Sequence, residues 1–137
     1  MSLYPQTIRV AAAQAAPVFL DRAKTVEKAC HLIEEAAKND AQLVVFPEAF
    51  IPGYPDWVWL VPNSRSRQLN DLYIELVNNA VAIPGEAAST LCKAAKSVNI
   101  HVAIGVHEIN AESSHASLYN SLLFINDEGQ IMGSTGS

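Results

Sequence analysis

The sequence predicts an α/β fold in which short buried strands alternate with amphipathic helices. Residues 22–38 and 86–97 repeat apolar side chains at three- and four-residue steps, which is the spacing of one helix face. Residues 41–46 and 100–109 are short apolar runs rich in β-branched side chains, as buried strands are. Strand, helix and strand in this order are typical of parallel strands joined by a crossover helix. We therefore expect a sheet that helices cover.

The first half of the chain opens with an expected strand at residues 8–14, and Pro17 breaks this apolar run before the first helix. Asp21 is placed to cap a helix from Arg22 to about Lys38, because its carboxylate can accept a hydrogen bond from a free N–H of the first turn. A second strand is expected over residues 41–46.

The second half begins with a polar segment, residues 63–68, that leads into a second helix. We expect the apolar stripe of this helix to face inward: Leu69, Leu72, Tyr73, Leu76, Val77 and Ala80. Further elements are expected at residues 86–97 (helix), 100–109 and 117–125 (strands), and 126–132 (a turn and a short strand).

Composition limits the classes of function. The chain has 137 residues, half of them apolar and 17% charged, so we expect residues 1–137 to form a single globular domain. A net charge of −5 argues against nucleic acid or an anionic membrane surface as partner. No apolar run reaches the roughly 18 residues that span a bilayer, and the N-terminus does not resemble a signal peptide. Two cysteines on expected helices indicate reduced thiols in a cytoplasmic protein.

The stretch most indicative of a site is residues 43–57. An apolar run stops at Pro47 and presents one carboxylate, Glu48, at the end of a rigid strand. A proline-rich loop comes next, and we expect its aromatic rings to wall a pocket beside Glu48: Phe50, Tyr54, Trp57 and Trp59. A carboxylate in a water-excluding site is suited to general acid–base catalysis. The alternatives are an ion-paired carboxylate and rings that simply pack.

Residues 45–55, Val-Phe-Pro-Glu-Ala-Phe-Ile-Pro-Gly-Tyr-Pro, resemble the first catalytic signature of the nitrilase branch of the carbon-nitrogen hydrolase superfamily. The resemblance implies that Glu48 is the general base and that Tyr54 lines the substrate pocket. Trp57, a candidate substrate-binding residue, and Trp59 either shape the mouth of this pocket or simply pack. Residues 8–14 and 118–133 are also similar to family strands. The family implies an α-β-β-α sandwich, of which this chain would be the N-terminal portion, and self-association into homo-oligomers. It implies no metal or organic cofactor.

The family's chemistry also needs a cysteine nucleophile and a lysine. Ser137 stands at about the lysine's place, and the segment that carries the family's cysteine is absent. Cys30 and Cys92 lie on expected helices and are interpreted as buried structural thiols. We therefore expect a chain truncated before the lysine and the cysteine, which does not hydrolyse nitriles alone.

Three functional hypotheses agree with these residues. The first is a nitrilase, which converts a nitrile to a carboxylic acid and ammonia. The second is a non-catalytic, truncated family member that acts in assembly or binding. The third is an amidase or carbamoylase, against which the Pro-Gly-Tyr-Pro loop argues.

The remaining polar residues carry weaker predictions. His101 and His107 fall on one face of a strand without a third ligand, so they predict no metal site. The roles of both histidines and of Glu108 stay open. Asn120 is expected to bond neighbouring backbone.

Overall fold

The computed structural model describes residues 7–110 and 117–136, apart from the side chains of residues 58, 59 and 136. It contains one mixed sheet in the order β1-β2-β4-β5-β6. Its strands are β1 (Val10–Ala12), β2 (Leu43–Val45), β4 (His101–Asn110), β5 (Ser117–Ile125) and β6 (Ile131–Gly136). A two-residue strand, β3 (Val81–Ala82), pairs with the far end of β4. The expected α/β class is confirmed.

The strands change direction twice across the sheet, between β4 and β5 and again between β5 and β6. β1, β2 and β4 run parallel, whereas β5 and β6 are added antiparallel through hairpin pairing. Val44 pairs with Val102, and Val102 pairs with Ile125, so these three side chains lie on one face. Because neighbouring residues of a strand point to opposite faces, His101, Ala103 and His107 lie on the other face.

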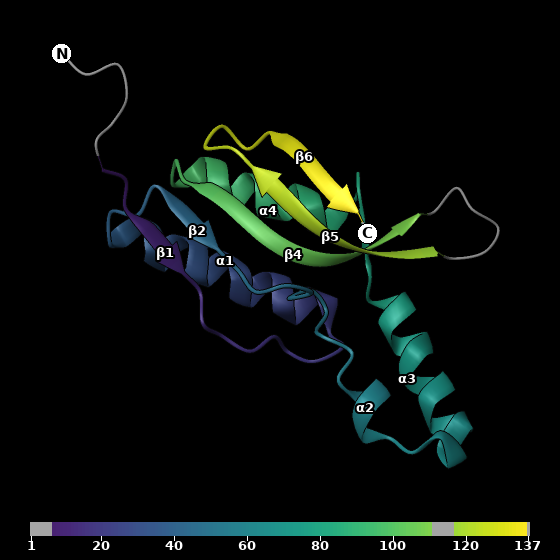
Figure 1. Cartoon of the computed structure of the whole chain (residues 1–137). Helices are drawn as coiled ribbons and strands as arrows, with labels where there is room; N and C mark the ends of the chain where they lie inside the picture. Colours follow the sequence, from purple (N-terminus) through teal and green to yellow (C-terminus); the bar gives the residue numbers. More distant parts are fainter. Residues whose placement is uncertain (1–6, 111–116, 137) are drawn as a thin grey trace.

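Helices cover only the first of these faces. α1 (Arg22–Lys38) and α4 (Glu86–Ser97) pack side by side behind the strands in the view of Figure 1. Their inward residues join the strands in one core that includes Val26, Ala29, Ile33, Leu91, Ala95, Val44, Val102, Ile104, Val106, Leu123 and Ile125. The opposite face of the sheet is turned toward the viewer of Figure 1 and has no helix over it in the described part of the chain.

Both covering helices begin and end where the sequence indicates. The Asp21 carboxylate accepts a hydrogen bond from the Lys24 N–H at 3.0 Å, which confirms the predicted cap of α1. The predicted bounds of α4 and of β5 are also confirmed. The first two strands are shorter than expected, since only three residues of each enter the sheet pairing.

The expectation for the second helix is wrong in one respect. α3 (Ser66–Asn78) forms as predicted, but Leu76 is the only described residue within it that is buried. Tyr73 is 50% exposed, although it belongs to the predicted inward stripe. Figure 1 shows the reason, because α3 extends away from the sheet together with α2 (Trp57–Leu60) and the 3₁₀ turn η1 (Asn63–Arg65). α2 itself was expected to be loop.

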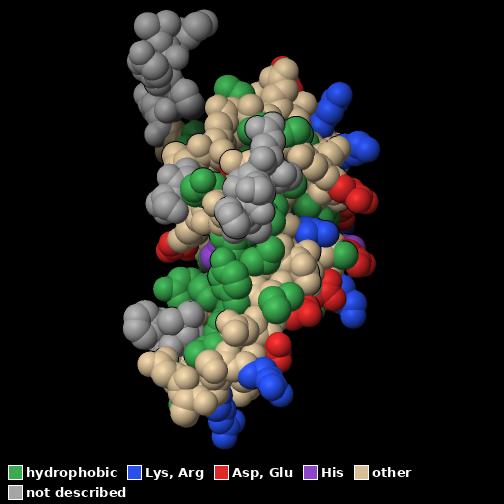
Figure 2. Space-filling view, turned by 90° about the vertical axis from the view of Figure 1, so that its right-hand side faces the viewer, with side chains coloured by type: hydrophobic (Ala, Val, Ile, Leu, Met, Phe, Trp, Pro, Cys, Tyr) green, Lys and Arg blue, Asp and Glu red, His purple; other side chains and the backbone are tan. Residues whose placement is uncertain are grey.

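The surface separates charge from apolar area. Figure 2 shows Lys, Arg, Asp and Glu side chains mainly along the right side, which is the side of the helix layer, and hydrophobic side chains across the middle. Exposed apolar residues include Val10, Tyr54, Leu60, Ile74, Phe124 and Met132. Among the described residues, no helix is long and apolar enough to cross a membrane.

Candidate active site around Glu48

Glu48 lies in a turn directly after β2, at the point where β1 and β2 end and β4 continues. The Phe46 N–H donates to the Ala103 carbonyl at 2.8 Å, so backbone pairing with β4 continues up to the turn. Ala49, the next residue after Glu48, is fully buried and has a φ of 53°. The buried Ala49 anchors the turn, and the Glu48 side chain is exposed.

The turn rests directly on strand β4 at Gly105. A Cβ atom at Gly105 would lie 2.5 Å from the Ala49 nitrogen and the Pro47 oxygen, and 2.7 Å from the Glu48 Cα. Real Cβ atoms do not approach this closely, so only glycine permits the turn to lie at this height above the sheet. The sequence pattern did not single out Gly105, because a glycine within a strand does not say which backbone approaches it.

Asn120 holds the Glu48 carboxylate. Its side-chain amide Nδ2 donates a hydrogen bond to Glu48 Oε1 across 72 residues of sequence. The sequence pattern did not predict this contact. The register offered a signal, since Asn120 lies opposite His107 on β4 and therefore on the same face as the Glu48 turn.

His107 completes the cluster. Its side chain is 8% exposed, and its backbone N–H donates to the Ile51 carbonyl at 2.8 Å. Burial lowers the pKa of His107, and a hydrogen bond with the Gly53 backbone and the charge of Glu48 offset part of that decrease. The imidazole is therefore neutral at neutral pH. His101 lies on the same face of β4, as predicted, but is exposed and 3.9 Å from the Asp127 carboxylate.

Two of the four aromatic rings expected around Glu48 are packed within the protein. Phe50 is 1% exposed and packs on Phe46 at a ring distance of 5.2 Å. Trp57 is 7% exposed and packs edge-on against Phe19 at 5.7 Å, so most of its surface already contacts protein. Both rings are drawn into packing because burial of their large apolar surface is favourable. Glu48 itself is exposed in this structure.

Tyr54 lies differently from the buried rings. It is 49% exposed and follows Gly53, whose backbone bonds His107, so its phenol has free surface near the cluster. The Trp59 side chain lies outside the described residues. Substrate contact by Tyr54 and Trp57 stays a prediction.

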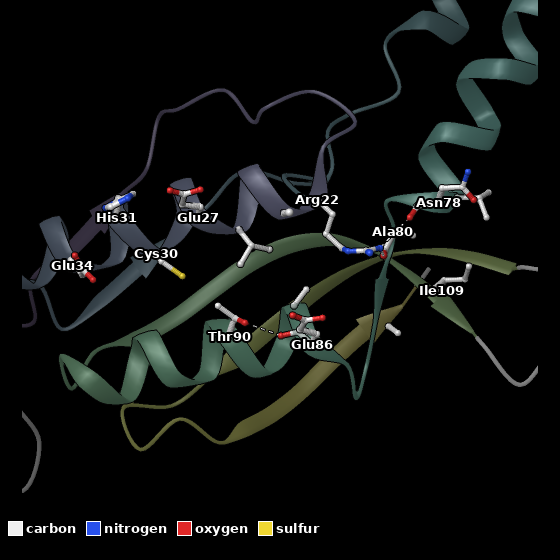
Figure 3. A pocket seen from close by; sticks show the side chains of 15 residues that line it. Arg22, Glu27, Cys30, His31, Glu34, Asn78, Ala80, Glu86, Thr90 and Ile109 are labelled. Atoms are coloured by element: carbon white, nitrogen blue, oxygen red, sulfur yellow. Dashed lines mark hydrogen bonds between the residues drawn. The ribbon is translucent and has the colours of Figure 1, made fainter.

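Neither cysteine of the chain is part of this cluster. Cys30 lies on α1, in a groove of about 780 Å³ between α1, α4 and the β3 region (Figure 3). Burial, together with the charges of Glu34 and Glu27, raises the pKa of the Cys30 thiol. Burial also raises the pKa of Cys92 on α4. Both helices cover the face of the sheet opposite Glu48, so the sheet separates these thiols from the carboxylate.

The same groove contains charged groups that are already engaged or exposed. In Figure 3 the Arg22 guanidinium reaches toward Asn78 and Ala80, whose carbonyls accept its hydrogen bonds at 3.1 and 2.7 Å. Glu27, Glu34 and Glu86 lie along its walls. Arg22 thus ties α1 to the segment that leads into β3.

The cluster around Glu48 has the chemistry of a general base. An exposed carboxylate can accept a proton from an incoming group, and the Asn120 amide orients it. Within the part of the chain that the structure describes, no group of three or more His, Cys, Asp or Glu side chains could hold a metal ion. The carboxylate follows a strand and is held by a side chain from another strand, so its position is defined by the sheet.

The sequence model of the carbon-nitrogen hydrolase family matches residues 9–136. The chain belongs to the carbon-nitrogen hydrolase family. The match includes every element described above, and it makes the chain part of an enzyme family. Carbon-nitrogen hydrolases of known sequence and structure give two further comparisons.

Curated relatives have names that refer to nitriles. The chain is 40% identical over 128 residues to an arylacetonitrilase of Aspergillus oryzae and 41% identical over 133 residues to a nitrilase of Bacillus sp. strain OxB-1. It is also 38% identical to an aliphatic nitrilase of Rhodococcus rhodochrous. These alignments include 93, 97 and 94% of the chain but only 36, 37 and 34% of the relatives. The chain therefore spans about a third of the length of these relatives.

Solved structures agree with the fold. An amidase from Nesterenkonia sp. superposes with a TM-score of 0.62 at 18% identity, over 95% of the chain and 42% of the amidase. A carbon-nitrogen hydrolase from Helicobacter pylori G27 gives 0.62 at 20% identity, over 95% of the chain and 39% of that protein. At this identity the similarity shows the fold alone. It agrees with the expected N-terminal portion of an α/β sandwich.

Proposed function

We propose that this chain supplies the general base, Glu48, for hydrolysis of a nitrile to a carboxylic acid and ammonia. The observation that carries the proposal is the Glu48 carboxylate at the end of β2, oriented by the Asn120 amide. The names of the relatives at about 40% identity support a nitrile as the small-molecule substrate.

In this mechanism Glu48 takes the proton of a cysteine thiol, and the thiolate attacks the nitrile carbon to form a covalent thioimidate. Water then releases first ammonia and afterwards the acid. A lysine ammonium stabilises the negative charge that develops on the substrate nitrogen. Cys30 and Cys92 lie behind the sheet, so we assign the nucleophile and the lysine to protein outside residues 1–137.

The first test is ammonia release by the chain itself and by a chimera. In the chimera this chain replaces the matching 37% of the Bacillus nitrilase, whose remaining part supplies the rest of a nitrilase. We expect turnover of phenylacetonitrile by the chimera and none by the isolated chain. Robust turnover by the isolated chain would contradict the assignment of the nucleophile. Reading the source gene beyond the codon for Ser137 complements this test, because a Lys-containing run and a later cysteine are expected there.

The role of Glu48 is tested in the same chimera. Glu48→Gln keeps the size of the side chain but removes the basic oxygen, so we expect kcat to fall by a factor of about 10² to 10⁴. Glu128→Gln, in the exposed turn before β6, is the matched control and should leave kcat unchanged. Activity that survives Glu48→Gln would reject Glu48 as the base.

An amidase is the second candidate reaction, because the amidase of Nesterenkonia sp. shares the fold. A panel that pairs each nitrile with its amide distinguishes the two, and we expect the nitriles to be turned over faster. A non-catalytic role in assembly is the third candidate.

We also propose self-association, because apolar side chains such as Val10, Phe124 and Met132 are exposed. Light scattering that shows a monomer at all concentrations would count against it.

A further inference from the structure

His107 is buried beside Glu48, yet half of its hydrogen-bonding capacity is unused. Its Nε2 atom is buried and has no hydrogen-bond partner among the described residues. The Gly53 backbone bonds the imidazole, and since Nε2 makes no bond, that bond belongs to Nδ1. A backbone carbonyl accepts hydrogen bonds, so Nδ1 carries the proton and Nε2 presents a lone pair.

Two segments flank His107 on β4. On one side of His107 lies the segment of Ile51, whose carbonyl accepts the His107 backbone N–H. On the other side lies β5, where Asn120 is the direct cross-strand partner of His107. Because the Asn120 amide also donates to Glu48, Asn120 lies next to both side chains, although His107 and Glu48 make no direct hydrogen bond in this structure.

Glu48 needs a different partner in each of its two protonation states. The Asn120 amide donates a hydrogen bond, which suits the ionised carboxylate. Once the carboxylate has accepted a proton, it becomes a donor and needs an acceptor. A neutral imidazole with a free Nε2 is such an acceptor, and Glu48 is the charged side chain that acts on His107 from the elements packed around it in the described structure.

We propose that His107 is a positioning residue for Glu48, and that the two side chains bind the proton taken up at this site as a pair. Glu48 receives the proton and turns from the Asn120 amide toward His107, whose Nε2 then accepts the hydrogen bond from it or the proton itself. The positive charge on His107 in the second case is balanced by the carboxylate. This inference rests on the proposed role of Glu48 as general base, and it goes beyond that role by naming where the proton is held.

The test begins with the isolated chain and does not depend on nitrile turnover. Imidazole ¹⁵N chemical shifts report the tautomer of His107, and we expect a protonated Nδ1 and a bare Nε2 at pH 7.5. Titration of the same signals in Glu48→Gln should show His107 taking up its proton at lower pH than in the wild type, because the favourable carboxylate is gone. Glu34→Gln, an exposed change on α1, is the control and should leave the titration unchanged.

Two results would overturn the proposal. One is a proton on Nε2 at pH 7.5, because that nitrogen would then be a donor. The other is identical titration of His107 in the wild type and in Glu48→Gln, because the two side chains would then be independent.

Kinetics in the chimera supply the second readout. His107→Phe removes the acceptor and should lower kcat by about tenfold with little change in KM. His107→Gln places an amide oxygen close to the position of Nε2 and should restore part of the activity. His101→Phe, the same change on the same face of β4 but at an exposed site, should have no effect.

The kinetic results also distinguish this inference from the proposed function. Loss of activity in Glu48→Gln with full activity in His107→Phe would reject the pairing alone. Full activity in Glu48→Gln would reject the general base itself.

Discussion

Gly105 and Ala49 meet where the turn that carries Glu48 lies on strand β4. Ala49 is fully buried in a left-handed conformation, and Gly105 leaves no room for a side chain beneath it. The carboxylate is thus placed by two small residues that have no chemistry of their own. Close backbone approach of this kind explains why a glycine is required in the interior of a strand.

Gly105→Ala should therefore destabilise the chain and displace Glu48. The added methyl group would lie 2.5 Å from backbone atoms of Pro47 and Ala49, which cannot rotate away, so we expect a loss of about 1–3 kcal/mol in the free energy of unfolding. Gly133→Ala is the matched control, because nothing lies within 4 Å of a Cβ there, and it should change stability by less than about 0.5 kcal/mol. Urea unfolding measures both. Equal stability of the two variants would mean that the turn does not rest on Gly105.

The thiol of Cys30 provides a second prediction at this scale. Its pKa is raised by burial first and then by Glu34 and Glu27, so Glu34→Gln should increase the thiolate fraction and speed alkylation by iodoacetamide at pH 8 by about twofold. Cys92 is an internal control, because burial alone raises its pKa and Glu34 does not act on it. Peptide-resolved mass spectrometry measures both rates. Equal acceleration at both thiols would indicate general loosening of the helices instead of the loss of one charge.

At the scale of elements, α1 is set by a cap at its start and by contacts along its length. The Asp21 side chain accepts the Lys24 N–H, and the Thr25 hydroxyl lies within hydrogen-bond distance of both the Asp21 and the Val18 carbonyl, at 2.7 and 2.9 Å. Arg22 then bonds the carbonyls of Asn78 and Ala80, which joins the first turn of α1 to the end of α3. The N-terminus of α1 is therefore held by contacts with two other segments, one at Val18 and one at Asn78 and Ala80.

Asp21→Ala should cost about 1 kcal/mol of stability, because it leaves an N–H of the first turn without its side-chain acceptor. Asp56→Ala is the control, since Asp56 precedes α2 but makes no capping hydrogen bond through its side chain. Thermal unfolding followed by circular dichroism compares the two. A loss in Asp56→Ala as large as that in Asp21→Ala would argue that net charge, and not capping, is responsible.

α3 should be the least protected helix of the three long ones. Leu76 is its only buried residue among those described, whereas α1 and α4 both contribute several residues to the core. Few buried contacts allow local opening at low free energy, so amides of α3 should exchange with deuterium faster than those of α1 and α4. Hydrogen exchange with mass spectrometry gives the comparison directly. Protection of α3 equal to that of α1 would show that something else covers it in solution.

At the scale of the whole molecule, the sheet is covered on one face by α1 and α4 and carries the Glu48 cluster on the other. The chain therefore has its hydrophobic core and its candidate site on opposite sides of one layer. The core and the candidate site are linked through β4, which contributes Ile104 and Val106 to the core and Gly105 and His107 to the site.

The lowered pKa of His107 predicts how the stability of the folded chain depends on pH. The pKa of His107 is lowered in the folded chain from an ordinary value of 6.5, so below that pH the unfolded chain binds more protons than the folded one. The stability that the neutral ring contributes is present above pH 6.5 and is lost as the pH falls toward the lowered folded value. Urea unfolding at pH 7.5 and 5.5 should thus show a larger loss for the wild type than for His107→Gln. The same loss in both would mean that His107 does not carry this dependence.

What the sequence by itself determined is local. Helical periodicity and a capping aspartate gave the bounds of α1, the apolar run ending at Pro47 placed Glu48 after a strand, and the residues around Glu48 indicated the family. Such features depend on neighbours within a few positions, where hydrogen bonding and side-chain direction are set directly by the residues present.

Only the tertiary structure decided which segments cover which faces. His101 and His107 share one face of β4, yet one is exposed and the other buried, because the Ile51–Gly53 segment lies beside His107 alone. Tertiary packing also decides that Tyr73, on the predicted inward stripe of α3, stays half exposed. Tertiary packing likewise brings Asn120 to the Glu48 carboxylate, 72 residues away in the sequence. A sequence pattern states which side chains point the same way, but burial depends on what packs against them, and that is a property of the folded chain.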